Sequence, residues 1–222
     1  MVSEEGREII LLGAAGRWAA EAAEIAEDGG WLVRGLVNNL RPEEVRPSDC
    51  PFPIYQLDQL PAALRGLPAL CVLLTPAYRR LLVEQAAACG ITNFVRLIHP
   101  SAQVFRSASL GAGAYVGPLA RLGRHAEVGC HTFVCSGVFV GHDAHVDDFV
   151  TLTPGASVGS LCRVQEGAYV GPGAILLPEV RVGRNAVVAA GAVVTEHVPD
   201  HCLVAGLPAI VKKTGIPGYR AG

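Results

Sequence analysis

Hydrophobic positions recur every six residues from Pro100 to Thr195, through sixteen consecutive hexads without an insertion. The fifth position of each hexad is Val or Leu, from Val104 to Val194, and the third is small or compact, mostly Ala. A sustained six-residue period is typical of a parallel β-helix, in which each hexad contributes one short strand and one turn. Three hexads close one coil, and the fifth-position side chains stack inside it. The pattern therefore predicts a continuous β-helix over residues 99–195.

Glycine closes eight of these sixteen hexads. Each of these positions falls where the chain leaves one strand and turns toward the next. We expect the glycines to lie at sharp corners, where their freedom in φ is useful.

Fourth-position side chains of the hexads point outward, and those one coil apart share a face of the helix. One ladder is polar: Ser109, Glu127, His145, Arg163 and Arg181. Another is mainly apolar: Tyr115, Phe133, Thr151, Tyr169 and Val187. An apolar ladder on the outside of a rod needs a covering partner, either a neighbouring subunit or the N-terminal part of the chain. Of the two we favour a neighbouring subunit, which predicts an oligomer.

The pattern changes completely before the repeat. A short apolar strand over Arg7–Leu12 is followed by a GAAG turn, an Ala- and Glu-rich helical stretch and a second strand over Trp31–Val37. Further on, ALCVLLT and FVRLI read as strands, with a helix at about 77–88 between them. Residues 1–98 are thus predicted to form a Rossmann-like α/β domain. A glycine turn at the carboxyl end of a strand can receive a phosphate, or it can simply join strand to helix.

Composition narrows the possible partners. The net charge is -2 and the sequence pI is about 6.4, so we expect neither nucleic acid nor an anionic membrane surface as a partner. The apolar runs are too short to span a bilayer, and the acidic N-terminus does not look like a signal peptide. Seven cysteines without a CxxC pair favour a reduced, cytoplasmic protein.

Four short motifs occur in a specific order: GAAG at 13–16, LIHPSA at 97–102, GHD at 141–143 and VAGLPA at 204–209. Together with the repeat, this set resembles the sialic acid O-acetyltransferase family of bacterial sugar acyltransferases. The resemblance implies a left-handed β-helix, a homotrimer, and acetyl-CoA bound in clefts between subunits. It also implies an N-terminal domain that holds a nucleotide-linked amino sugar and a C-terminal tail, 196–222, that closes the coenzyme A site. The predicted reaction is direct transfer of an acetyl group to the sugar's amino group.

The same resemblance assigns substrate-binding positions in and beyond the N-terminal domain. They are Gly13, Ala14, Gly16, Arg17, Asn38 and Thr151. The chain departs from the family pattern at Arg17-Trp18, at Asn38-Asn39 and at Thr75-Pro76. Asn38-Asn39 stands where a dinucleotide-binding strand would end in an acidic residue, so NAD binding is not expected. All three departures fall where the acceptor would be recognised, so the identity of the sugar is left open.

His142 opens its hexad and is therefore expected at a corner of the helix, outside the packed interior. A histidine can remove the proton of an attacking amine or hydroxyl. The resemblance places the general base on His142, with Asp143 as the carboxylate that orients its ring. Asp147 and Asp148 are alternatives for that second role. His145 falls in the polar ladder and is expected to face solvent.

The resemblance also implies the coenzyme A contacts. The oxyanion would accept a hydrogen bond from the Ser160 N–H, and the pantetheine arm would lie near Ala190 and Gly191. Gly206 and Pro208 belong to the tail that covers the adenine end. Lys212, with Lys213, would either meet the 3′-phosphate or remain an ordinary surface charge.

Three other functions compete with this one. A trimeric zinc carbonic anhydrase would collect histidines, and His125, His131, His142 and His145 are enough in number. Their spacing and the GHD context do not fit zinc, so no metal is expected. An O-acetyltransferase of a free sugar such as sialic acid, and a non-catalytic trimeric binding or scaffold protein, remain the two alternatives.

Overall fold

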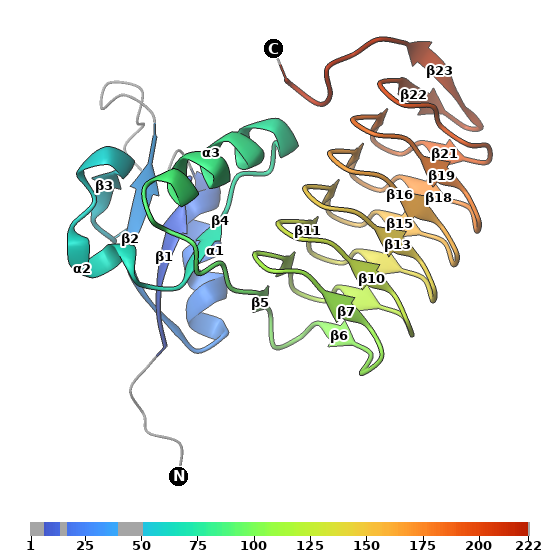
Figure 1. The fold of residues 1–222 in the computed structure, drawn as a ribbon. Coiled ribbons are helices and arrows are strands. Elements are labelled where there is room, and N and C mark those ends of the chain that lie inside the picture. The colour runs from blue at the N-terminus through green and yellow to red at the C-terminus, as the bar shows by residue number, and fades with distance from the viewer. Residues whose placement is uncertain (1–6, 14–16, 40–50, 222) are drawn as a thin grey trace.

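The computed structural model describes residues 7–13, 17–39 and 51–221. An α/β part at the N-terminus lies against one side of a β-helix, and the C-terminal tail returns from the last strand toward the α/β part (Figure 1). In the part of the chain that is described, no helix is both long enough and apolar enough to cross a membrane.

The N-terminal part contains a four-stranded parallel sheet of order β3-β2-β1-β4. Its strands are β1 (Arg7–Leu12), β2 (Trp31–Asn38), β3 (Ile54–Gln56) and β4 (Ala69–Cys71). The helical segments are α1 (Arg17–Asp28), η2 (Leu57–Gln59), α2 (Ala62–Arg65) and α3 (Pro76–Ala88). Helix α1 buries alanines at helical spacing, including Ala19, Ala22, Ala23 and Ala26, which explains its Ala-rich sequence.

The segment FVRLI does not extend the N-terminal sheet as a full strand. Only Leu97–Ile98 forms a strand, β5, and it pairs with the β-helix strand Tyr115–Val116. The Leu97 N–H donates to the Ala114 carbonyl, so the β-helix sheet begins two residues before the predicted boundary at 99. Phe94 retains a single bridge to Ala69 of the N-terminal sheet.

Each coil of the β-helix contributes to three parallel sheets, here called the docking, open and polar faces. The docking face holds β5, β8 (Tyr115–Val116), β11 (Phe133–Val134), β14 (Thr151–Leu152), β17 (Tyr169–Val170), β20 (Val187–Val188), β22 (Leu203–Gly206) and the antiparallel β23 (Ala209–Lys213). The open face holds β6 (Gln103–Val104), β9 (Arg121–Leu122), β12 (Phe139–Val140), β15 (Ser157–Val158), β18 (Ile175–Leu176) and β21 (Val193–Val194). The polar face holds β7 (Ser109–Leu110), β10 (Glu127–Val128), β13 (His145–Val146), β16 (Arg163–Val164) and β19 (Arg181–Val182).

The hexad register predicted from the sequence is confirmed. Glu127 pairs with His145, and Phe133 with Thr151, one coil apart in each case. Third- and fifth-position side chains such as Ala144 and Val146 are buried inside the coil. These parallel sheets and the hexapeptide period are consistent with a left-handed β-helix.

The reason proposed for the hexad-closing glycines is wrong. Positive φ angles fall mainly two residues later, at the second residue of the next hexad, as at Asp143 (φ 57°). The closing glycines instead lie against the backbone of the next coil. A Cβ on Gly141 would meet the Ser160 nitrogen at 2.5 Å, closer than real Cβ contacts come. Close stacking of coils therefore explains these glycines.

The partner predicted for the apolar ladder is also wrong, because the chain covers the docking face itself. Tyr115, Phe133 and Thr151 are fully buried beneath the N-terminal part. Further along, the Tyr219 ring of the C-terminal tail stacks on Tyr169 at a centroid distance of 3.6 Å. The apolar ladder thus packs against the N-terminal part and the C-terminal tail of the same chain.

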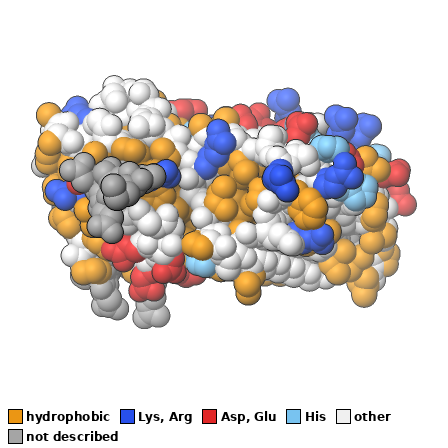
Figure 2. Space-filling view, turned by 90° about the horizontal axis from the view of Figure 1, so that it is seen from below, with side chains coloured by type: hydrophobic (Ala, Val, Ile, Leu, Met, Phe, Trp, Pro, Cys, Tyr) orange, Lys and Arg blue, Asp and Glu red, His pale blue; other side chains and the backbone are white. Residues whose placement is uncertain are grey.

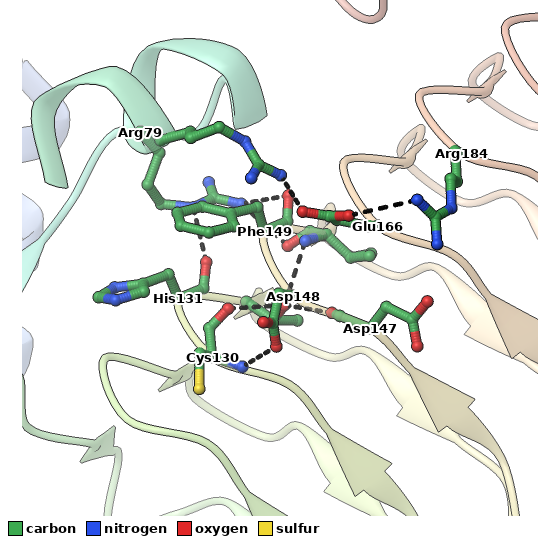
Figure 3. A network of polar contacts seen from close by, with 11 residues as sticks. Arg79, Cys130, His131, Asp147, Asp148, Phe149, Glu166 and Arg184 are labelled. Atoms are coloured by element: carbon green, nitrogen blue, oxygen red, sulfur yellow. Dashed lines mark hydrogen bonds and ion pairs between the residues drawn. The ribbon is translucent and has the colours of Figure 1, made fainter. Parts of the chain in front are cut away.

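Arg79 of α3 is the central contact of this junction, although its side chain is fully buried. Its guanidinium donates to the carbonyls of His131 (2.7 Å) and Leu73 (2.6 Å) and to Thr151 Oγ1 (3.0 Å). Further hydrogen bonds reach the carbonyls of Leu74, Phe149 and Val150. Figure 3 shows this network at the corner between the docking and polar faces. Burial lowers the pKa of Arg79 to about 10, which leaves it charged at neutral pH.

Candidate active site

His142 and Asp143 form the turn between β12 and β13, at the corner where the open and polar faces meet. His142 Nδ1 lies 2.7 Å from Asp143 Oδ2, and the His142 side chain is 59% exposed. An ionised carboxylate only accepts hydrogen bonds, so Nδ1 must carry the proton. The lone pair of Nε2 is then left for a proton from a substrate.

The Asp143 carboxylate is held by two histidines. His125, at the same corner one coil earlier, places its Nδ1 3.2 Å from Asp143 Oδ1. The hydrogen bond from His142 is the main cause that lowers the pKa of Asp143 below its ordinary value, and the bond from His125 adds to it. Asp143 therefore stays ionised and able to accept at neutral pH.

The two alternative carboxylates contact other groups. Asp147 Oδ1 lies 3.1 Å from His145 Nε2, and Asp148 Oδ1 accepts the Cys130 N–H at 2.6 Å. His145 also places Nδ1 2.8 Å from Glu127 Oε2 and is exposed on the polar face, as expected. Of the three aspartates near His142, Asp143 is thus the one in contact with its ring.

Ser160 lies on the same corner as His142, one coil further along the helix. At other corner positions the first N–H of a hexad donates to an aspartate of the next coil, as from Cys130 to Asp148 and from Arg184 to Asp200. The residue one coil beyond Ser160 is Pro178, whose side chain has no acceptor. Within the described ranges no acceptor is found for the Ser160 N–H.

The other predicted coenzyme A residues lie away from this corner. Ala190 and Gly191 are exposed at the corner between the docking and open faces, so the width of the open face separates them from His142. Gly206 and Pro208 belong to the exposed β22–β23 hairpin, and Lys212 is exposed on β23.

The predicted sugar-binding positions are only partly described. Gly13 directly follows β1 with φ 102°, and its N–H donates to the Val37 carbonyl at 2.7 Å. Asn38 ends the adjacent strand β2 and is buried, so both lie at the carboxyl edge of the parallel sheet. Ala14 and Gly16 lie outside the described residues. Arg17 begins α1, and its side chain is also outside them.

The substrate contact predicted for Thr151 is wrong. Its side chain is fully buried on the docking face. The hydroxyl donates to the Leu74 carbonyl at 2.7 Å and accepts from Arg79 at 3.0 Å. Thr151 therefore ties the β-helix to the N-terminal part and cannot reach a substrate.

Two important residues were missed by the sequence reasoning. His125 was considered only as a zinc ligand, although it and Asp143 are both second-position residues one coil apart, a spacing that predicts contact. Arg79 gave no signal, because a buried arginine in a helix looks like a surface one in sequence. Among the described residues, no group of three or more His, Cys, Asp or Glu side chains could hold a metal ion.

Comparison with known proteins agrees with this architecture. Residues 161–196 match the family model described as bacterial transferase hexapeptide (six repeats). No match is found among curated protein sequences. The repeat and the fold resemble those of hexapeptide-repeat acyltransferases, and the chain has the architecture of a bacterial sugar acetyltransferase.

Three solved structures are especially similar over nearly the whole chain. One is a mutant of GDP-perosamine N-acetyltransferase from Caulobacter crescentus, in which a histidine is replaced by alanine, in complex with CoA and GDP-perosamine. Its sequence identity to this chain is 27% and its TM-score is 0.83, and the match covers 93% of this chain and 97% of that one. The acetyltransferase domain of PglB from Neisseria gonorrhoeae, in complex with acetyl coenzyme A, has 29% identity and a TM-score of 0.81, covering 93% and 99%. WeeI from Acinetobacter baumannii, at 19% identity, a TM-score of 0.75 and coverage of 91% and 98%, supports the fold alone. The predicted resemblance is confirmed.

Proposed function

We propose that this protein transfers the acetyl group of acetyl-CoA to the amino group of a nucleotide-linked sugar, with His142 as the general base. The observation that carries the proposal is the exposed His142 ring, whose Nδ1 is hydrogen-bonded to an ionised carboxylate 2.7 Å away. It is supported by the similarity to an enzyme solved with CoA and GDP-perosamine.

In the proposed reaction, His142 Nε2 takes a proton from the neutral amino group as its nitrogen attacks the thioester carbonyl. The new C–N bond gives a tetrahedral oxyanion, which accepts the Ser160 N–H. When the C–S bond breaks, the imidazolium returns the proton to the coenzyme A thiolate. Asp143 stabilises the imidazolium while it exists. The acetyl group is never attached to the protein.

Assembly into a homotrimer is part of the proposal. The chain passes each coil in the order docking, open, polar, so the His142 corner lies across the helix from the docking face and from the N-terminal part. A sugar held by the N-terminal part of the same chain would be on the wrong side of the helix. A neighbouring copy must then bring its sugar, or its coenzyme A contacts, to this corner.

The open face supports such an interface. Large hydrophobic side chains are exposed along it and at its edge beside His142: Phe139, Leu161, Ile175 and Leu177. An apolar surface of this kind favours contact with another copy of the chain. Three copies related by closed symmetry would form the proposed trimer. In Figure 2 a group of histidine side chains lies beside charged ones on the side of the β-helix farthest from the N-terminal part.

For the acceptor, we propose that the N-terminal part is Rossmann-like and holds the sugar nucleotide at the carboxyl edge of its sheet, near Gly13 and Asn38. The order β3-β2-β1-β4 supports this, because ligands of open parallel sheets bind at that edge. Coenzyme A would run along the open face, past Ala190 and Gly191, toward Gly206, Pro208 and Lys212. A cytoplasmic location, where acetyl-CoA is made, belongs to the same proposal.

The direct test supplies acetyl-CoA and a panel of UDP-, GDP- and dTDP-linked amino sugars and measures free thiol. Wild-type protein should release thiol with at least one sugar, and His142→Ala should lose about a hundredfold or more in kcat. Full activity in that variant would refute the mechanism. If free sialic acid is acetylated and none of the nucleotide-linked sugars leads to thiol release, the O-acetyltransferase is favoured. No binding of acetyl-CoA by calorimetry would favour a scaffold.

A further inference from the structure

His125 and His142 share one carboxylate at the corner of the β-helix. His142 Nδ1 meets Asp143 Oδ2 at 2.7 Å, and His125 Nδ1 meets the other oxygen, Oδ1, at 3.2 Å. Both histidine side chains are more than half exposed, so neither is held by burial. The backbone beneath His125 is fixed as well, because its N–H donates to Ser107 Oγ at 3.2 Å.

The second hydrogen bond restricts how Asp143 can move. The Asp143 side chain is 44% exposed, and a carboxylate with that much access to water can rotate and take water as a donor instead of His142. With Oδ1 held by His125, rotation of the carboxylate group would break two hydrogen bonds rather than one. Oδ2 is therefore kept facing the His142 ring.

We infer that His125 is a positioning residue for the acetyl transfer: it holds the Asp143 carboxylate in the orientation that keeps the proton of His142 on Nδ1 and its Nε2 free to act as base. This inference rests on the proposed function. In the described part of the chain the His125 ring has no hydrogen bond to His142, so it acts through Asp143.

The kinetic test compares His125→Gly with His125→Asn. Position 125 has φ 54°, a conformation that glycine and asparagine tolerate, so both variants should fold. His125→Gly should lower kcat about tenfold with little change in KM for acetyl-CoA. His125→Asn should recover most of that loss, because its amide can donate where Nδ1 does.

The matched control is His145→Ala, another exposed histidine that bridges carboxylates, Glu127 and Asp147, of the same helix. It should leave kcat unchanged. In an Asp143→Asn background, His125→Gly should have no further effect, since the carboxylate it positions is gone. Equal rates in His125→Gly and His145→Ala, or an additive double variant, would overturn the inference.

A measurement without acceptor sugar separates this inference from the proposed function. Nitrogen NMR of ring-labelled histidine should show the proton of His142 on Nδ1 in the wild-type protein. In His125→Gly it should show a mixture of the two tautomers, and in His125→Asn the Nδ1-protonated tautomer should predominate again. An unchanged tautomer in His125→Gly would refute the positioning role. Absence of thiol release from wild type with every acceptor would refute the proposed function, while the NMR comparison would still decide the role of His125.

Discussion

At the scale of single residues, the β-helix corner gives chemically similar side chains different roles. His142 and His145 are three residues apart, yet one lies in a turn beside Asp143 and the other in a strand between Glu127 and Asp147. The turn leaves the ring of His142 at the meeting of two faces. The strand directs His145 outward among charged neighbours. Position within the hexad thus decides which histidine can serve as a base.

The carboxylate partner of His142 can be tested by Asp143→Asn. An amide can present an N–H to His142 Nδ1, which favours the tautomer with the proton on Nε2, where it blocks the proposed base. We expect kcat to fall by about a hundredfold or more while acetyl-CoA binding is retained. Steady-state kinetics and calorimetry would measure the two effects. Asp147→Asn is the control, because Asp147 contacts His145 instead; equal losses in both variants would contradict the assignment.

At the scale of the element, each coil of the β-helix restricts which side chains fit in the coil stacked against it. Gly141→Ala would bring a Cβ to 2.5 Å from the Ser160 nitrogen, and this neighbour is backbone that cannot turn aside. We expect the free energy of unfolding to fall by about 1–3 kcal/mol, measured by chemical denaturation. Gly66→Ala, where the added Cβ meets nothing within 4 Å, should be nearly neutral. Equal stability of the two variants would argue against close coil stacking as the reason for glycine.

The buried His131, in the turn that leads into β11 on the docking face, predicts that stability depends on pH. His131 is buried between the rings of Phe94 and Phe149, and burial, with the nearby Arg79 charge, lowers its pKa to about 4. The unfolded chain binds this proton near pH 6.5 and the folded one does not. Stability should therefore fall as the pH drops from about 6.5 to 4.

His131→Phe removes this group and should flatten the pH dependence in that range. Denaturation midpoints at pH 7 and pH 4.5 would measure the difference between variant and wild type. His145→Phe, at an exposed site, should keep the wild-type slope. The same slope in His131→Phe as in wild type would contradict the buried neutral state.

At the scale of the whole molecule, a buried arginine fastens the N-terminal part to the β-helix. Arg79→Leu would leave several buried carbonyls and the Thr151 hydroxyl without their donor. We expect a loss of about 3–5 kcal/mol in the free energy of unfolding and faster hydrogen exchange in α3. Arg80→Leu removes a partly exposed ion pair with Glu166 and the contact of the guanidinium with the Phe149 ring, and should cost about 1–2 kcal/mol. Similar losses in both variants would show that Arg79 has no special role.

Much of the fold follows from the sequence because the period of the repeat is local. Each hexad places its third and fifth residues inside and its fourth outside, whatever the rest of the chain does. The sixteen hexads, their register and the corner position of His142 could therefore be derived before any coordinates. The ordered motifs added the acyltransferase class, which the structural matches confirm.

What the sequence could not decide depends on contacts between distant segments. An apolar ladder predicts that something covers it, but only the tertiary structure shows that α3 and the C-terminal tail do so, with Arg79 fastened to Thr151. The hexad register places His125 one coil from Asp143, but only the structure shows that its ring meets the second carboxylate oxygen. Periodicity fixes which way a side chain points. Which neighbour it meets is fixed by packing, hydrogen-bond geometry and the path of the chain between its elements.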